Sequence, residues 1–288
     1  MASKTILLDV GGTFIKCSDG REVPIDSDGT REEIASSLRE ALSGAEMAAV
    51  AIPGPFRYAD GTFLMKHKFA AVYGEKFADL VAPEGNVTEG NCPAVAKKKA
   101  DAPLGQLPSG AAPRYRFIHD VNCMLLGEMV GGAGKGYGRV ALVTLGTGLG
   151  FALSVDGEIL CNELGSPRIV IYNRPYRDGI LEDYVSKRGL LRGWEGITVK
   201  ELAQRAFEGD AAARERFRDR GSILASCLAP LLREYGIQCL LFGGQISRSY
   251  ALMAQAVEEG LREVDSLQYV GPVSDMGHAT FNGLRTLL

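Results

Sequence analysis

The first stretch of the chain that could carry out chemistry is Asp9-Val10-Gly11-Gly12-Thr13, which follows a short apolar run. Glycines in a tight turn expose backbone N–H groups that can bind phosphate oxygens, because no side chain lies in the way. A carboxylate such as that of Asp9 could hold a hydrated Mg²⁺ beside those phosphates. The alternative is a tight hairpin without a ligand, and this stretch alone does not decide between the two.

A second stretch repeats the same pattern near the middle of the chain. Residues 142–159, like residues 6–23, form an apolar run, a Gly/Thr turn, a second apolar run and an Asp-Gly turn. The repeat predicts two similar halves that each open with a β-hairpin. Two matching loops favour phosphate binding over plain hairpins, and the residues we expect to line the phosphates are Gly11, Gly12, Thr13, Gly146, Thr147 and Gly148.

Two other glycine-rich nucleotide motifs do not fit these stretches. A dinucleotide-binding fingerprint needs glycines that open a helix, whereas a strand pattern follows Gly146–Gly150. Residues 131–138 contain Gly-Lys but lack the earlier glycine and the following Ser or Thr of a P-loop. Both loops are therefore interpreted as hairpin turns.

The overall composition indicates a soluble globular protein. The chain has 288 residues, of which 46% are hydrophobic and 23% charged, and this length suggests two domains. A net charge of −3 argues against a nucleic-acid partner, and the six cysteines show no zinc or disulfide spacing. The weakly polar run at 139–156 is shorter than the ~20 residues of a membrane helix. We therefore expect a cytoplasmic protein without a membrane partner.

Strand and helix patterns alternate around the two loops and must position them. Thr30 with Glu33, and Thr198 with Glu201, have the spacing of helix capping boxes. Pro230 lies inside a long helical pattern, which we expect it to kink or interrupt. Residues 92–114 are rich in proline and alanine and are interpreted as a mobile surface excursion, with a functional lid as the alternative. The predicted strands cover 5–10, 13–18, 21–25, 47–56, 115–120 and 237–247, and two more lie within 139–160 with a glycine loop between them. The predicted helices cover 30–44, 121–132, 198–207, 213–236, 250–264 and a last segment after residue 277.

Five stretches, in this order, resemble the actin/hexokinase/Hsp70 ATPase fold and, more narrowly, the ROK (repressor, open reading frame, kinase) family of sugar kinases. They are DVGGTFIK at 9–16, AIPGPF at 51–56, HDVNCMLLGE at 119–128, TLGTGLG at 144–150 and LLFGGQIS at 240–247. The resemblance covers nearly the whole chain. It implies an α/β fold of two actin-like ATPase (ribonuclease H-like) domains with a nucleotide cleft between them. We expect one domain at 1–118 plus a C-terminal helix at about 275–288, and a larger one at 119–274.

The resemblance also implies an activity and residue roles. The activity is ATP-dependent transfer of the γ-phosphate to a sugar hydroxyl, as in a glucokinase, with Mg²⁺ as cofactor and a homodimer as the assembly. Asp120, at the end of a strand, would be the general base that takes the hydroxyl proton; the alternative for Asp120 is a helix N-cap, and the two roles are compatible. Gly243 and Gly244 would lie against adenosine, Asp9 would hold Mg²⁺ through water, and the residues expected to bind the substrate are Gly54, His119, Asn122, Glu163 and Glu182.

The chain departs from the family pattern on the sugar side. His119 stands where the family has Asn, and Ser166 stands where the family has a histidine that serves sugar and zinc. The zinc-binding cysteine segment is missing, with Ile180 in place of a cysteine, so we predict no zinc site. Glu163 as a turn cap and Glu182 as a helix start are the alternatives to their ligand roles.

Two other functions remain open at this point. One is a sugar- or nucleotide-binding sensor without turnover, and the other is an ATPase or kinase of the same superfamily that acts on a non-sugar substrate. The sequence leaves open which sugar and hydroxyl would react, whether His119 and Ser166 change the substrate class, the oligomeric state and the role of residues 92–114.

Overall fold

The computed structural model describes residues 4–82 and 114–288, and it divides into two compact units. The first unit comprises residues 1–120, 161–166 and 284–288. The second unit comprises residues 121–160 and 167–283. The expected excursion at 92–114 lies, except for residue 114, outside the described residues.

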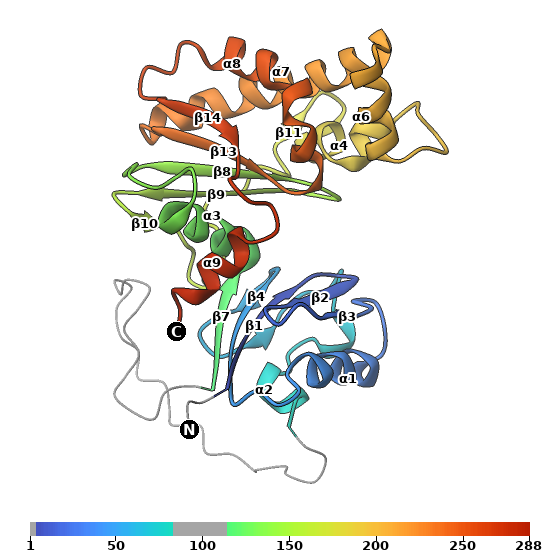
Figure 1. The fold of residues 1–288 in the computed structure, drawn as a ribbon, viewed down its shortest axis with the longest axis vertical. Helices are drawn as coiled ribbons and strands as arrows, with labels where there is room; N and C mark the ends of the chain where they lie inside the picture. Colours follow the sequence, from blue (N-terminus) through green and yellow to red (C-terminus); the bar gives the residue numbers. More distant parts are fainter. Residues whose placement is uncertain (1–3, 83–113) are drawn as a thin grey trace. The chain divides into compact units, whose positions relative to one another are not determined.

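The first unit is built on a five-stranded mixed sheet with the order β3-β2-β1-β4-β7 (Figure 1). Strands β1 and β2 form the predicted hairpin, while β4 and β7 run parallel to β1. The residues at the parallel strand ends, Asp9 in β1 and His119 in β7, therefore come to one edge of the sheet. The strands are β1 (Thr5–Val10), β2 (Phe14–Cys17), β3 (Glu22–Pro24), β4 (Met47–Ile52) and β7 (Tyr115–His119).

Short helices and a small hairpin complete the core of the first unit. Helix α1 begins after Thr30, whose hydroxyl accepts the Glu33 N–H while the Glu33 carboxylate accepts the Thr30 N–H, which confirms the first capping box. Ile34 and Leu38 of α1 pack with an aromatic group around Phe56, Phe63 and Phe77. The elements are α1 (Arg31–Ala41), β5 (Phe56–Arg57), β6 (Thr62–Phe63), η1 (Ala70–Val72) and α2 (Phe77–Leu80).

The second unit repeats the sheet of the first, with the order β10-β9-β8-β13-β14. Again an antiparallel hairpin comes first, and two parallel strands follow on its other side. This equivalence confirms the two similar halves predicted from the sequence. The strands are β8 (Val140–Leu145), β9 (Leu149–Val155), β10 (Glu158–Ile159), β13 (Cys239–Gly243) and β14 (Tyr269–Pro272).

Helices cover both faces of the second sheet (Figure 1). Helices α3 (Asp120–Gly131) and α9 (Ala279–Arg285) lie on one face, where Leu125 packs with Leu142 and Leu241. Helices α7 (Ala211–Glu234) and α8 (Ala254–Leu261) lie on the other face. The remaining elements are β11 (Pro175–Tyr176), β12 (Gly179–Ile180), α4 (Leu181–Val185), α5 (Lys187–Leu191), α6 (Val199–Glu208) and η2 (Gln245–Leu252).

Two helix predictions differ from the structure. Pro230 does not interrupt α7, which is continuous over 24 residues. The helix expected at 250–264 is shorter, because residues 245–252 form a 3₁₀ segment and α8 begins at Ala254. The second capping box, Thr198 with Glu201, is present at the start of α6.

The expected division at 118/119 differs by two residues from the division that the structure shows at 120/121. The segment 161–166 also groups with the first unit, and the last helix α9 is divided between the units at 283/284. The first part of α9 groups with the second unit because it contacts α3 closely. A Cβ on Gly127 of α3 would overlap the Ala279 carbonyl oxygen, so these two helices pack backbone to backbone. In the described part of the chain, no helix is long and apolar enough to cross a lipid bilayer.

Candidate functional site

The first glycine turn joins β1 to β2 and is held by backbone hydrogen bonds. The Gly11 N–H donates to the Phe14 carbonyl at 2.9 Å, and the Ser27 N–H donates to the Gly12 carbonyl at 3.1 Å. A Cβ on Gly11 would lie 3.0 Å from the Phe14 oxygen, so the turn is too tight for a side chain there. The turn therefore presents bare backbone, as an anion-binding loop requires.

The Asp9 carboxyl lies beside this turn at the end of β1. Its pKa is raised from 3.8 to about 6, chiefly by burial and also by the negative charge of Asp120, while the charge of Lys16 opposes the shift. No residue in the described ranges donates a hydrogen bond to the Asp9 side chain. A buried carboxylate near a second carboxylate and without a protein donor fits a hydrated divalent cation, which supplies the missing positive charge.

The second glycine turn joins β8 to β9 and is held by α4 and α5. The Gly146 N–H donates to the Gly148 carbonyl at 3.0 Å, and the Lys187 N–H donates to the Gly146 carbonyl at 2.9 Å. The Leu149 N–H donates to Glu182 Oε2 at 2.8 Å, and a Cβ on Gly148 would lie 2.9 Å from that same oxygen. Glu182, predicted as a substrate ligand, therefore lies against the second turn.

Gly243 ends strand β13 in the second unit, and Gly244 follows it directly. Gly244 has a φ of +84°, and a Cβ there would overlap the backbone of Leu145 at the end of β8. A Cβ on Gly243 would lie 2.6 Å from the Met124 sulfur. Both glycines are required by close packing, and they lie at the same sheet edge as the second glycine turn.

The proposed base, Asp120, is the first residue of α3 and directly follows β7. Oδ1 of Asp120 lies 2.9 Å from Nδ1 of His119. The Asp120 side chain is 39% exposed and that of His119 is 15% exposed. The carboxylate is thus open to a ligand on one side, while the imidazole orients it from the other.

Gly54 lies at the centre of a polar cluster in the first unit. A Cβ on Gly54 would lie 3.1 Å from Ser166 Oγ, 3.3 Å from the Tyr58 hydroxyl and 3.4 Å from the His119 ring. A side chain at residue 54 would therefore crowd three groups that can hydrogen-bond, and glycine lets the backbone approach them closely. Three of the positions singled out from the sequence, Gly54, His119 and Ser166, are brought together here.

Tyr58 is the member of this cluster that sequence reasoning missed. Its hydroxyl donates to the Ile52 carbonyl at 3.0 Å, and its ring lies 5.9 Å from the His119 ring. Burial and the charge of Asp120 raise the pKa of Tyr58, and a hydrogen bond with Ser166 opposes them. The only signal in the sequence is an aromatic residue shortly after Pro-Gly-Pro.

The other predicted substrate residues lie elsewhere. Glu163 is exposed in the first unit, in a turn where Asn162 Oδ1 accepts the N–H groups of Leu164 and Ser166 at 3.0 and 3.1 Å. Asn122 is 1% exposed and belongs to the second unit. Asp9, the first turn, Gly54, His119, Asp120 and Glu163 lie in the first unit, and Asn122, the second turn, Glu182, Gly243 and Gly244 lie in the second.

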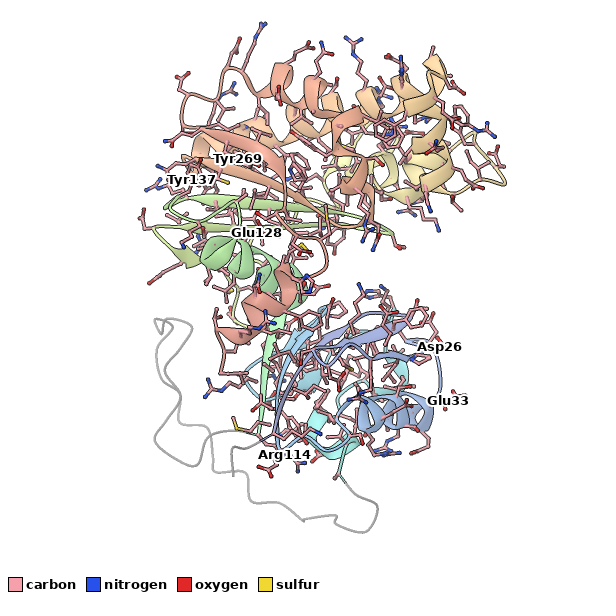
Figure 2. All side chains as sticks on the ribbon, in the orientation of Figure 1. Asp26, Glu33, Arg114, Glu128, Tyr137 and Tyr269 are labelled. Carbon is pink, nitrogen blue, oxygen red and sulfur yellow. The ribbon has the colours of Figure 1, made fainter. Side chains whose placement is uncertain are left out.

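A buried carboxylate of α3, Glu128, is structural. It is 2% exposed and accepts the N–H of Ala133 at 2.9 Å and both the N–H and hydroxyl of Ser274. Figure 2 labels it with Tyr137 and Tyr269 in the second unit. Glu128 thus ties the glycine-rich stretch 131–138 to α3, which explains that stretch without a phosphate.

Comparison with known proteins gives a family and a fold. Residues 110–167 match the model of the ROK family. The predicted resemblance to the ROK family is confirmed. An ROK family glucokinase from Streptomyces griseus, solved with glucose and AMPPNP, superposes with a TM-score of 0.71 at 22% identity, over 98% of this chain and 98% of that one. The two-domain ROK fold predicted from the sequence is confirmed by this likeness.

Two curated proteins also resemble the chain over part of its length. An uncharacterised protein of Clostridium perfringens is 28% identical over 50% of this chain and 52% of its own length. The N-acetylgalactosamine kinase AgaK of a Shewanella species is 27% identical over 61% of this chain and 63% of its own length. The chain thus spans between half and two thirds of the length of these two relatives.

Proposed function

We propose that the chain is an ATP-dependent kinase that transfers the γ-phosphate to a hydroxyl of a sugar. The observation that carries the proposal is the pairing of His119 with Asp120 at the end of β7, in a unit that also holds a bare glycine turn and a buried Asp9. A half-exposed carboxylate at a strand end is where a general base for a hydroxyl is expected. The kinase names of the relatives support the same activity.

Each group has a task in this proposal. The Asp120 carboxylate takes the proton of the acceptor hydroxyl as phosphoryl transfer proceeds. Backbone N–H groups of the two glycine turns bind the phosphate oxygens, and Gly243 and Gly244 lie against adenosine. Mg²⁺, held by Asp9 through water, supplies positive charge beside the phosphates. Gly54, His119, Asn122, Glu163 and Glu182 bind the acceptor.

The proposal is tested by ADP release with ATP, Mg²⁺ and a panel of hexoses, N-acetylated amino sugars and other polyols. Turnover with one sugar that is lowered about 10²- to 10⁴-fold by Asp120→Asn, with ATP binding retained, supports it. ATP binding without turnover on any acceptor contradicts it and favours a sensor. ATP hydrolysis that no sugar stimulates favours an ATPase or a kinase for a non-sugar substrate.

Three further properties belong to the same proposal. We propose that the kinase is a cytoplasmic homodimer, as the resemblance to the ROK family suggests for the assembly. We also propose that it holds no zinc, because Ser166 and Ile180 replace the family's histidine and cysteine. Light scattering on the purified chain measures the mass of the assembly, and elemental analysis measures the metal. A monomeric mass would contradict the homodimer, and stoichiometric zinc would contradict the absence of a zinc site.

A further inference from the structure

The ammonium of Lys68 lies against the first glycine turn, although the residue is far from it in sequence. A Cβ built on Gly12 would lie 3.7 Å from Lys68 Nζ and 3.8 Å from Lys68 Cε. Because Gly12 has no side chain, nothing at that position separates the ammonium from the backbone of the turn. Both residues belong to the first unit.

The backbone holds Lys68 at this position. The Ser27 N–H donates to the Gly12 carbonyl at 3.1 Å, and the Phe69 N–H donates to the Ser27 carbonyl at 2.6 Å. Ser27 is 6% exposed and Phe69 is fully buried. Phe69 has a φ of +52°, a left-handed conformation that a large side chain adopts only when the surroundings hold it. The approach of Lys68 to the turn is therefore built into the fold.

The charge of Lys68 has no partner among the residues that the structure describes. The side chain is half-buried, and none of the residues in 4–82 and 114–288 forms a hydrogen bond or an ion pair with it. The neighbouring Lys66, in contrast, is exposed and lies over the Tyr73 ring at 5.1 Å. An unpaired ammonium beside bare backbone N–H groups is the arrangement that a phosphoryl group neutralises.

We propose that Lys68 is a phosphate-binding residue, which contacts the phosphoryl oxygens of ATP bound at Gly11, Gly12 and Thr13. This inference rests on the proposed function for its catalytic consequence, but not for the binding itself. The ammonium adds a cation on the side of the first turn, where it offsets negative charge that spreads over the phosphoryl oxygens during transfer.

The test is Lys68→Met, with Lys66→Met as the matched control. Calorimetric titration measures the affinity of each variant for ATP and for inorganic tripolyphosphate without any acceptor. We expect Lys68→Met to weaken both affinities about tenfold or more, since a hydrogen bond to a charged group is lost, while Lys66→Met stays within about twofold of the wild type. Thermal unfolding of both variants checks that the fold is kept.

Kinetics then separates this inference from the proposed function. If the wild type phosphorylates a sugar, we expect kcat/KM for ATP to fall about 10²-fold in Lys68→Met, with the KM for the acceptor unchanged. If Lys68→Met binds ATP and tripolyphosphate as tightly as Lys66→Met does, the role of Lys68 is overturned and the kinase proposal stands. A wild type that turns over no sugar but binds tripolyphosphate through Lys68 overturns only the kinase proposal. A wild type that binds neither phosphate compound overturns both.

Discussion

The imidazole Nδ1 of His119 lies 2.9 Å from Oδ1 of Asp120, across the junction where β7 ends and α3 begins. Both side chains leave the backbone at consecutive positions, so this contact follows from the local geometry of a strand that passes directly into a helix. It links the proposed base to the cluster of Gly54, Tyr58 and Ser166, because His119 contacts that cluster through its ring.

The contact predicts that residue 119 affects the choice of acceptor sugar more than the binding of ATP. We expect His119→Asn to lower kcat/KM for the preferred sugar about tenfold or more and to change the ranking of sugars, because the imidazole that orients Asp120 is lost. The KM for ATP should stay the same. Initial rates over a sugar panel measure both effects.

His278 provides a matched control, since its Nδ1 also lies 2.9 Å from an aspartate, Asp275, at an exposed position. His278→Asn should leave the rates and the ranking unchanged. An unaltered ranking in His119→Asn would refute the specificity role of His119.

The buried carboxyl of Asp9 predicts a cost to stability at neutral pH. Its pKa is raised from 3.8 to about 6, so the folded state binds the proton more tightly than the unfolded state. Stability from this group is therefore largest below about pH 4, falls as the pH rises toward 6, and stays low above it. Asp9→Asn should stabilise the metal-free protein at pH 7 by up to about 3 kcal/mol, while it lowers phosphoryl transfer.

Urea unfolding at pH 4 and pH 7, with a chelator present, measures this difference. The increase in the free energy of unfolding caused by Asp9→Asn should be small at pH 4 and large at pH 7. Asp28→Asn, at an exposed position of the same unit, should show no such dependence on pH. Equal effects of Asp9→Asn at both pH values would show that burial does not raise the pKa of Asp9.

The hydrogen bond from Leu149 to Glu182 predicts that this carboxylate shapes the second glycine turn. We expect Glu182→Ala to raise the KM for ATP about tenfold, because the buried side of the turn loses an acceptor for its N–H group. The KM for the acceptor, measured in parallel, shows whether Glu182 also binds the sugar. Glu163→Ala, at an exposed residue outside this turn, should leave the KM for ATP unchanged. An unchanged KM for ATP in Glu182→Ala would contradict the positioning role.

The packing of α3 on α9 predicts opposite effects at two glycines of one helix. A Cβ on Gly127 would overlap the carbonyl oxygen of Ala279, whereas a Cβ on Gly131 would meet nothing within 4 Å. Gly127→Ala should therefore destabilise the fold by about 3 kcal/mol, since the backbones must move apart. Gly131→Ala should be neutral or stabilise by up to about 1 kcal/mol. Urea unfolding of the two variants side by side measures the contrast, and similar midpoints would contradict it.

Local features were predictable from the sequence because they depend on neighbouring residues. The two hairpins come from apolar strands around a glycine turn, and the capping boxes at Thr30 and Thr198 need only a glutamate three residues later. The repeated order of these elements also predicted the repeated sheets. The absence of an interruption at Pro230 has a tertiary reason: α7 packs closely on α8, where a Cβ on Gly260 would lie 2.5 Å from Ala225, and this packing favours a continuous helix across the proline.

Only the tertiary structure shows which residues from distant parts of the chain come together. The sequence by itself determined the two glycine turns, the position of Asp120 at a strand end and the departures at His119 and Ser166. It did not show that Tyr58 joins Gly54 and Ser166, that Asp9 is buried near Asp120, or that Lys68 lies against Gly12. These contacts depend on how β1, β4 and β7 align in one sheet and on the path of the loops between them, and no periodicity or spacing in the sequence encodes that alignment.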